Sequence, residues 1–174
     1  MKAISVVGER VEWTDRAVPR PGPGEVLIRV RATAVNRADL LQRAGAYPVP
    51  PGASPILGLE CAGEIQSIGS GVTRCAIGDP VCALLSGGGY AEQVVVPEGQ
   101  VLPIPDGLDF VKAAAIPEVF ATAWLNLYRE GGLTPGERVL LHAGASGVGT
   151  AAIQLCRVFG NPCFVTAGSS EQIA

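Results

Sequence analysis

The stretch VLLHAGASGVGTAAIQL, Val139–Leu155, decides the fold of this chain. It starts with apolar residues typical of a buried strand, reaches a cluster of small residues, and continues with apolar residues at helical spacing. In a G-x-G-x-x-G turn the small residues let the chain turn, let the backbone approach a pyrophosphate, and let the helix pack on the strand. The cluster nearly matches this pattern, with serine at the middle glycine position, and comprises Gly144, Ala145, Ser146, Gly147, Val148 and Gly149. The stretch predicts either a phosphate cradle or a tight strand-to-helix corner without a ligand.

The residues that follow favour the cradle. We expect the helix to end at Gly160, and residues 163–168, CFVTAG, are typical of a second buried strand. Strand, helix and strand make a βαβ unit, and such units build parallel sheets. The start of the helix then offers free N–H groups and a partial positive charge to phosphates. We therefore predict a dinucleotide site at Gly144–Gly149, and the ligand-free corner remains the alternative.

The end of the second strand indicates which dinucleotide binds. NAD sites usually carry Asp or Glu about twenty residues after the glycine turn, where it holds the ribose 2′-OH. This chain has Ala167, Gly168, Ser169 and Ser170 there. The first carboxylate after the glycine turn is Glu171. Small and hydroxyl-bearing residues leave room for a 2′-phosphate, so we predict NADPH with Gly168 and Ser169 in its site. Glu171 is the evidence against this, unless it is an exposed residue in the first turn of the next helix.

The first hundred residues predict a β-rich domain. Residues 25–35, EVLIRVRATAV, show strand alternation, and four more short strands are expected at 2–7, 61–69, 79–85 and 90–97. Many short strands separated by Gly and Pro are typical of a barrel or a sandwich.

Two helical patterns interrupt or follow these strands. A short helix is expected after Asn36, which is a candidate N-cap with Asp39 at the third following position and Gly45 at the end. From Asp109 a longer helical pattern runs to Gly131, broken by Pro117. The change of pattern divides the chain into a β-rich domain and an α/β portion.

Composition excludes several classes of protein. The chain has 174 residues, 48% of them hydrophobic, and a net charge of −3, with no run of Lys or Arg for phosphate contacts to nucleic acid. No apolar run reaches the roughly 18 residues of a membrane span, and the N-terminus lacks the pattern of a signal peptide. Five scattered cysteines without a C-x-x-C pair argue against disulfides and zinc clusters, so we expect reduced thiols packed as small apolar side chains.

Four segments together resemble the medium-chain dehydrogenase/reductase superfamily: AVNRADLLQRAGAYPVPPGASPILGLECAG (34–63), IGDPVCALLSGGGYAEQVVVPEG (77–99), AAAIPEVFATAW (113–124) and the opening stretch. Within it they resemble the zinc-independent quinone oxidoreductases of the ζ-crystallin type, close to the tumour-suppressor-inducible quinone reductases. The resemblance implies a mixed β and α/β fold. Residues 1–118 would form a GroES-like β-barrel catalytic domain, and residues 119–174 the first βαβ part of a Rossmann domain that holds NADPH, with the active site in the cleft between them. It also implies that the chain is an N-terminal half, which we expect to be inactive without the rest.

The same resemblance indicates whether the chain has the residues to bind a catalytic zinc ion. Asn36 and Leu59 stand where the zinc alcohol dehydrogenases carry Cys and His ligands, and Glu118 falls near the place of the last Cys. Glu60 and Glu118 remain as possible ligands, but two carboxylates make a poor zinc site. We therefore expect no metal, and Glu60 to be structural rather than catalytic. His142, the single histidine, is expected to be a packed and hydrogen-bonded core residue.

The resemblance places Asn36, Tyr47 and Thr122 near the nicotinamide ring as catalytic residues. Asn36 would bind the cofactor ribose or the substrate, Tyr47 the quinone oxygen, and Thr122 the carboxamide side of the nicotinamide. Each residue also has a structural alternative. Asn36 would be only a helix N-cap, Tyr47 would anchor its loop, and the Thr122 hydroxyl would bond to the backbone of its own helix. The glycines of SGGGY, 86–90, would shape the substrate entrance or simply form a hairpin.

The implied function is NADPH-dependent reduction of a quinone or another small electrophile. Reduction of the C=C bond of an enone or enoyl thioester, and non-catalytic NADPH binding as in crystallins, are the alternatives. We expect a cytoplasmic protein that forms a homodimer and does not bind nucleic acid or membrane.

Overall fold

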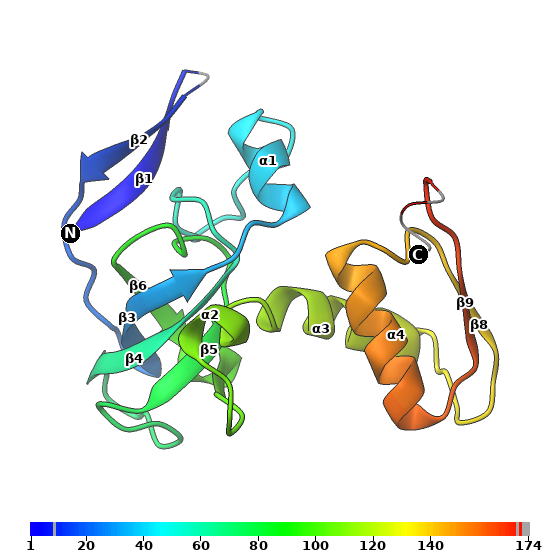
Figure 1. Cartoon of the computed structure of the whole chain (residues 1–174). Helices are drawn as coiled ribbons and strands as arrows, with labels where there is room; N and C mark the ends of the chain where they lie inside the picture. The colour runs from blue at the N-terminus through cyan, green and yellow to red at the C-terminus, as the bar shows by residue number, and fades with distance from the viewer. Residues whose placement is uncertain (9, 170, 172–174) are drawn as a thin grey trace. The chain divides into compact units, whose positions relative to one another are not determined.

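The structure is a computed structural model that describes residues 1–8, 10–169 and 171. The chain divides into two compact units, Met1–Pro117 and Glu118–Ala174, and each is described by itself (Figure 1). Within the described residues, no helix combines the length and the apolar character needed to cross a membrane.

The first unit is built on a five-stranded antiparallel sheet in the order β6-β3-β4-β5-β7. Its strands are β3 (Glu25–Thr33), β4 (Glu60–Ile68), β5 (Pro80–Leu84), β6 (Gln93–Pro97) and β7 (Val101–Pro103). Alternate residues of β3 enter the core, where Val26 and Ile28 are fully buried against Ile65 and Val96. Burying each such side chain stabilises the fold by about 1.5–3 kcal/mol. The alternation expected for residues 25–35 is therefore the pattern that forms the core.

A hairpin of β1 (Lys2–Val7) and β2 (Arg10–Asp15) precedes this sheet. It meets the rest of the unit through an isolated bridge between Ala3 and Ala91 and a hydrogen bond from the Ile4 N–H to the Tyr90 carbonyl (2.8 Å). Figure 1 shows the hairpin beside the sheet. The sequence predicted β1 but not β2, because five of the six β2 residues are exposed and carry no burial pattern.

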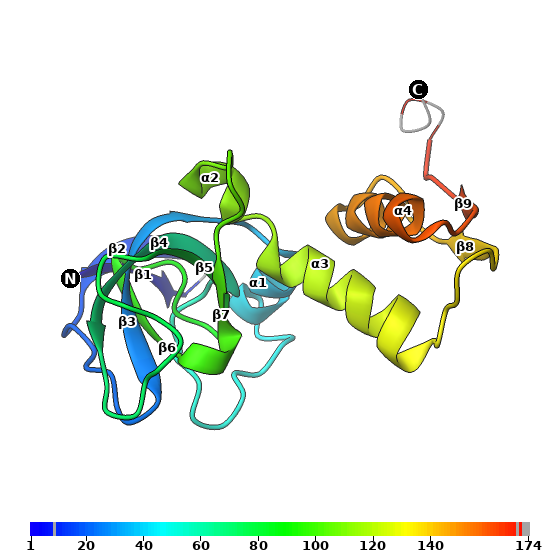
Figure 2. The same ribbon diagram turned by 90° about the horizontal axis from the view of Figure 1, so that it is seen from below.

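Short helices connect and cover the strands. The helix α1 (Arg37–Arg43) follows Asn36, as expected, and a single 3₁₀ turn (Glu98–Gln100) separates β6 from β7. The helix α2 (Phe110–Ala113) packs its buried Ala113 and the following Ala114 against Ala62 and Cys82 of the sheet (Figure 2). The helical pattern from Asp109 is interrupted as predicted, since α2 ends before Pro117 and α3 (Pro117–Trp124) begins with it.

The second unit contains the predicted βαβ arrangement. The helix α3 continues into a π-helical segment (Leu125–Glu130), followed by β8 (Val139–Leu141), α4 (Gly147–Phe159) and β9 (Cys163–Val165). The two strands pair in parallel, Val139 with Cys163 and Leu141 with Val165. The helix α4 ends at Gly160, which adopts the left-handed conformation (φ 72°).

The core of the second unit lies between α3, α4 and β8. Ala123, Ala151 and Ala152 are buried there and are covered by larger side chains such as Leu141 and Leu155. Beside this core Trp124 stacks on Tyr128, and Phe159 packs against both rings at a tilt, with ring centroids 4.8–5.3 Å apart. The paired residues Leu140 and Phe164 are each 58% exposed, so the β8–β9 pair presents an apolar face to solvent.

Candidate cofactor turn and polar cluster

The glycine turn joins β8 to α4 through a tightly hydrogen-bonded corner. The Ser146 N–H donates to the Ala143 carbonyl (2.9 Å), and Ala143 has a left-handed backbone (φ 57°). Ser146 is the N-cap of α4, and its hydroxyl accepts from the Gly149 N–H (3.0 Å). The serine at the middle glycine position therefore starts the helix, which explains why this residue type suits the turn.

Two glycines in the turn allow close approaches that a side chain would prevent. A Cβ atom on Gly144 would lie 2.6 Å from the Cβ of Val165 in β9, and one on Gly149 would lie 2.5 Å from the Ala143 carbonyl oxygen. Gly144 thus lets the turn pack on the neighbouring strand, and Gly149 lets the helix pack on the turn. These are the packing roles that the sequence pattern predicts.

The outer side of the turn is open to a ligand. Ala145, Ser146, Gly147 and Val148 are exposed, whereas Gly144 and Gly149 are buried. Exposed backbone at the N-terminus of a 13-residue helix combines N–H donors with the positive end of the helix dipole. A helix start of this kind has the donors and the partial charge that suit a phosphate group.

Thr166, the first residue after β9, holds the turn in place. Its carbonyl accepts from the Gly144 N–H (2.9 Å), and its own N–H donates to the Leu141 carbonyl (3.0 Å). Its hydroxyl lies 3.1 Å from Nδ1 of His142 and accepts from the Ala143 N–H (3.4 Å). Sequence reasoning missed Thr166, although its place at the end of the second strand of a parallel pair was the available signal.

The prediction of a core histidine at position 142 is wrong in part. His142 has the expected hydrogen-bonding partner, in Thr166, but its side chain is exposed. The reason is that β8 ends at Leu141, so the next residue already lies in the turn outside the packed core.

The end of β9 lies beside the glycine turn, because parallel strands bring their carboxyl ends to one edge. Gly168 and Ser169 are exposed there, and Ala167 is half-buried. Glu171 is also exposed, whereas Ser170 lies outside the described residues. The residues predicted to meet the cofactor 2′-phosphate therefore follow directly from a strand that contacts the turn.

The first unit contains a buried polar cluster around Asn36. The Asn36 side-chain nitrogen donates to Oε1 of Glu60 (2.8 Å), and the Asn36 main-chain N–H donates to the Asp39 carboxylate (2.8 Å). Asp39 and Glu60 are 2% and 1% exposed. Asn36 occupies the expected N-cap position of α1, and its side chain contacts Glu60 on β4.

Asp39 joins this cluster to two further segments. Its carboxylate accepts from the Gly58 N–H (3.0 Å) and from the Tyr90 hydroxyl (3.0 Å). Burial, and then the charge of Asp39, raise the pKa of Tyr90, so the phenol stays protonated and donates. Single-sequence patterns gave no signal for Tyr90, which lies far from Asp39 along the chain.

The other two predicted catalytic residues lie in different units. Tyr47 is in the loop after α1 of the first unit and is 39% exposed. Thr122 is half-buried in α3 of the second unit, where its carbonyl accepts from the Asn126 side chain (2.8 Å). The structure thus brings Asn36 to Glu60 within one unit, and Thr122 belongs to the other.

Two of the positions compared with zinc ligands, Asn36 and Leu59, lie beside Glu60. Leu59 is buried beside Glu60, and the described residues contain no group of three His, Cys, Asp or Glu side chains suited to hold a metal ion.

All five cysteines are free, and three are buried: Cys61, Cys82 and Cys156. Cys75 and Cys163 are half-buried, so most but not all of the thiols are packed as predicted. Burial raises the pKa of the Cys61 thiol to about 12.

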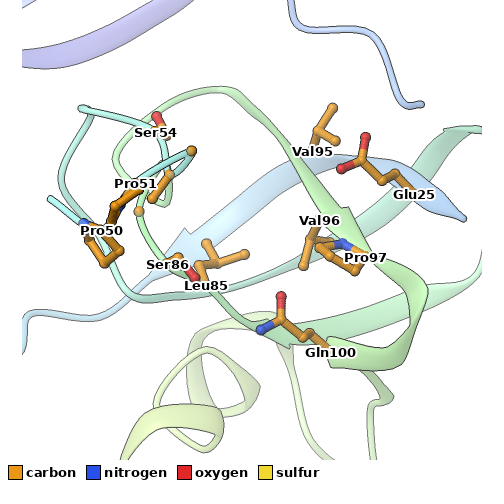
Figure 3. Close-up of a pocket in the computed structure, with 13 residues that line it drawn as sticks. Glu25, Pro50, Pro51, Ser54, Leu85, Ser86, Val95, Val96, Pro97 and Gln100 are labelled. Carbon is orange, nitrogen blue, oxygen red and sulfur yellow. The ribbon is translucent and has the colours of Figure 1, made fainter. Parts of the chain in front are cut away.

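A pocket of about 300 Å³ opens elsewhere on the first unit (Figure 3). The proline-rich loop at Pro50–Ser54, the segment Leu85–Gly87 and the strand β6 line it. The first residues of SGGGY therefore border a hollow, although neither Asn36 nor Tyr47 lines it. The pocket is separate from the polar cluster.

The family model that matches this chain covers residues 22–106 and is described as the alcohol dehydrogenase GroES-like domain. Residues 22–106 form a GroES-like domain of alcohol dehydrogenase type. The matched residues lie within the first unit and make up just under half of the chain.

Among curated proteins, the chain is 42% identical to the human synaptic vesicle membrane protein VAT-1 homolog over 159 residues, which is 91% of this chain and 40% of that protein. The chain thus spans well under half the length of this relative.

Three solved structures share the fold. The human VAT-1 homolog-like protein has a TM-score of 0.89 at 36% identity, covering 99% of this chain and 57% of that chain. The CurK enoyl reductase has a TM-score of 0.87 at 32% identity, covering 98% and 55%. The quinone oxidoreductase from Thermus thermophilus, solved also in complex with NADPH, has a TM-score of 0.82 at 38% identity, covering 99% and 55%.

Proposed function

We propose that this chain carries the cofactor turn and nicotinamide-facing residues of an NADPH-dependent quinone reductase. The observation that carries the proposal is the exposed glycine turn, held by Thr166 beside a strand end without a carboxylate at Gly168 and Ser169. The similarity to a quinone oxidoreductase solved with NADPH supports it.

The glycine turn would bind the cofactor through its backbone. The exposed N–H groups at the start of α4 would donate to the pyrophosphate, and the buried Gly144 and Gly149 would keep the turn close to the strand and helix. Ser169 would donate its hydroxyl to the 2′-phosphate, and Gly168 would leave space for it.

Bound NADPH supplies a hydride, and the residues of this chain would orient its acceptor. Asn36 would hydrogen-bond the nicotinamide ribose or the substrate, Thr122 the nicotinamide carboxamide, and Tyr47 the quinone oxygen that gains negative charge. A quinone accepts a hydride readily because its reduced product is aromatic, so positioning contributes most of the required catalysis.

The donor set favours a zinc-independent reaction. Catalytic zinc needs about three N, S or O ligands and an open position. Near Glu60 the chain offers the amide of Asn36, engaged by Glu60, and the apolar Leu59. Neither is a zinc ligand of the usual kind.

Reduction of an activated C=C bond is the second candidate. The similarity in sequence and fold to the CurK enoyl reductase favours this reaction. Both reactions need a hydride donor and a hydrogen bond to an oxygen that gains charge, so the residues named above would serve either one. We also propose that the protein is a cytoplasmic homodimer.

NADPH oxidation by the full-length protein with ortho-quinones, enones and enoyl thioesters as acceptors tests the proposal. We expect the highest kcat/KM with a quinone, and we expect Tyr47→Phe and Thr122→Ala to lower turnover more than they weaken NADPH binding. A higher kcat/KM with an enoyl thioester would favour the second candidate. Oxidation with none of the acceptors, despite NADPH binding, would contradict both.

A further inference from the structure

Glu60 is a buried carboxylate whose side chain contacts a predicted ligand-binding residue. It is the first residue of β4, is 1% exposed, and accepts from the Asn36 side-chain nitrogen at 2.8 Å. Its backbone is also anchored, because the Thr33 hydroxyl donates to its carbonyl (2.7 Å). At this burial the Glu60 side chain contacts Asn36 and is shielded from solvent.

The backbone of Asn36 is fixed independently of its side chain. Its N–H donates to Asp39 Oδ2 (2.8 Å), and its carbonyl accepts from the Asp39 N–H (3.1 Å). Asp39 in turn accepts from the Gly58 N–H two residues before Glu60, so the start of α1 and the start of β4 belong to one network. The capping box at the start of α1 also involves the Asn36 side chain.

An asparagine side chain has two different ends, one that donates and one that accepts. Here Oε1 of Glu60 is the acceptor, so the nitrogen end of the Asn36 carboxamide faces Glu60 and the oxygen end faces away. The contact therefore selects one of the two orientations of the Asn36 carboxamide and places its oxygen at the end away from Glu60.

We propose that Glu60 is a positioning residue that locks the Asn36 carboxamide in one orientation, so that Asn36 presents one fixed pattern of donor and acceptor to a bound cofactor ribose or substrate. The part of this inference that concerns a ligand rests on the proposed function. The orientation itself does not, because it is set within the first unit.

Magnetic resonance of the unliganded chain tests the orientation. We expect nuclear Overhauser contacts from the Asn36 side-chain amide protons to the Glu60 side chain, and amide signals displaced from those of a free carboxamide. Glu60→Leu, which keeps the size and removes the acceptor, should return these signals to free positions. Glu60→Gln, which keeps one acceptor oxygen but adds a donor, should shift them less far toward those positions. Wild-type amide protons without contacts to Glu60 would overturn the proposal whether or not any variant folds.

Kinetics of the protein test the consequence for function. Loss of a positioned hydrogen bond corresponds to about a tenfold change, so Glu60→Leu should lower kcat/KM by about that factor. Glu60→Gln, which keeps one acceptor oxygen, should lower kcat/KM less. Glu64→Leu is the matched control, since Glu64 lies on the same strand and pairs with Arg29 and Arg31. Equal kcat/KM losses in Glu60→Leu and Glu60→Gln would contradict a positioning role. If the wild-type protein neither binds nor oxidises NADPH while the amide contacts are present, the proposed function fails and the orientation stands.

Discussion

Replacing Gly149 with alanine tests how closely the helix packs on the glycine turn. The new methyl group would lie 2.5 Å from the Ala143 carbonyl oxygen and 2.7 Å from that of Gly144. Both are backbone atoms that cannot rotate away. Overpacking costs about 1–3 kcal/mol, and the better helix propensity of alanine returns up to about 1 kcal/mol. With three atoms inside 3 Å we expect a net loss of about 2 kcal/mol in the free energy of unfolding of the second unit.

Gly147→Ala is the matched control, two residues earlier in the same helix. A methyl group there would lie 3.1 Å from Cγ1 of Val119, a side-chain atom that can shift. Because the clash is mild and alanine favours the helix, we expect a change between zero and about 1 kcal/mol of added stability. The two substitutions therefore have opposite expected signs.

Denaturant unfolding followed by the fluorescence of Trp124 measures both variants. Trp124 stacks on Tyr128 within the second unit (centroids 4.8 Å apart) and reports on its packing. A Trp13→Phe background removes the other tryptophan, which is 65% exposed in the first unit. The reasoning is refuted if Gly149→Ala unfolds at the wild-type denaturant concentration, or if Gly147→Ala loses as much stability as Gly149→Ala.

Three further predictions concern single residues. Ala143→Gly should raise the free energy of unfolding by about 1 kcal/mol, because it relieves a left-handed backbone at a non-glycine residue; an unchanged or lower value in the same assay would contradict this. Gly168→Asp should invert the preference for NADPH over NADH in titration calorimetry, since a carboxylate would repel the 2′-phosphate, whereas the wild-type order of affinities would show that this residue is not at the phosphate. Cys61 should stay unmodified by a thiol reagent at pH 8 while the half-buried Cys75 reacts, and rapid labelling of Cys61 in the folded chain would oppose the assigned burial. Because the pKa of Cys61 is raised from 9.0 to about 12, its contribution to stability is complete below pH 9 and is lost as the pH rises toward 12.

Residues that carry a repeating pattern could be predicted from the sequence. Val26 and Ile28 alternate along one strand, and their burial on one side of the sheet follows from period two. The glycine turn combined an apolar strand, small residues and a helical pattern, and both of its buried glycines have the expected packing roles. In these cases the residues that form the local pattern are also the residues that make the tertiary contact.

Features that depend on contacts distant in sequence could not be predicted. The strand β2 is exposed at most positions and is stabilised by pairing with β1. Glu60 meets Asn36 across 24 residues, and Tyr90 meets Asp39 across 51, so neither contact leaves a local signal. His142 is misplaced for another reason: β8 ends with the apolar run at Leu141, so His142 already lies in the turn.

Titration calorimetry of the full-length protein with NADPH and with NADH tests the central claim most directly. The glycine turn should bind the pyrophosphate of both cofactors, and the carboxylate-free end of β9 at Gly168 and Ser169 should favour the one with the 2′-phosphate. Each charge-assisted hydrogen bond contributes about 1.5–3 kcal/mol, so we predict that NADPH binds more tightly by at least about tenfold. Equal affinities, tighter binding of NADH, or no binding of either cofactor would contradict the account.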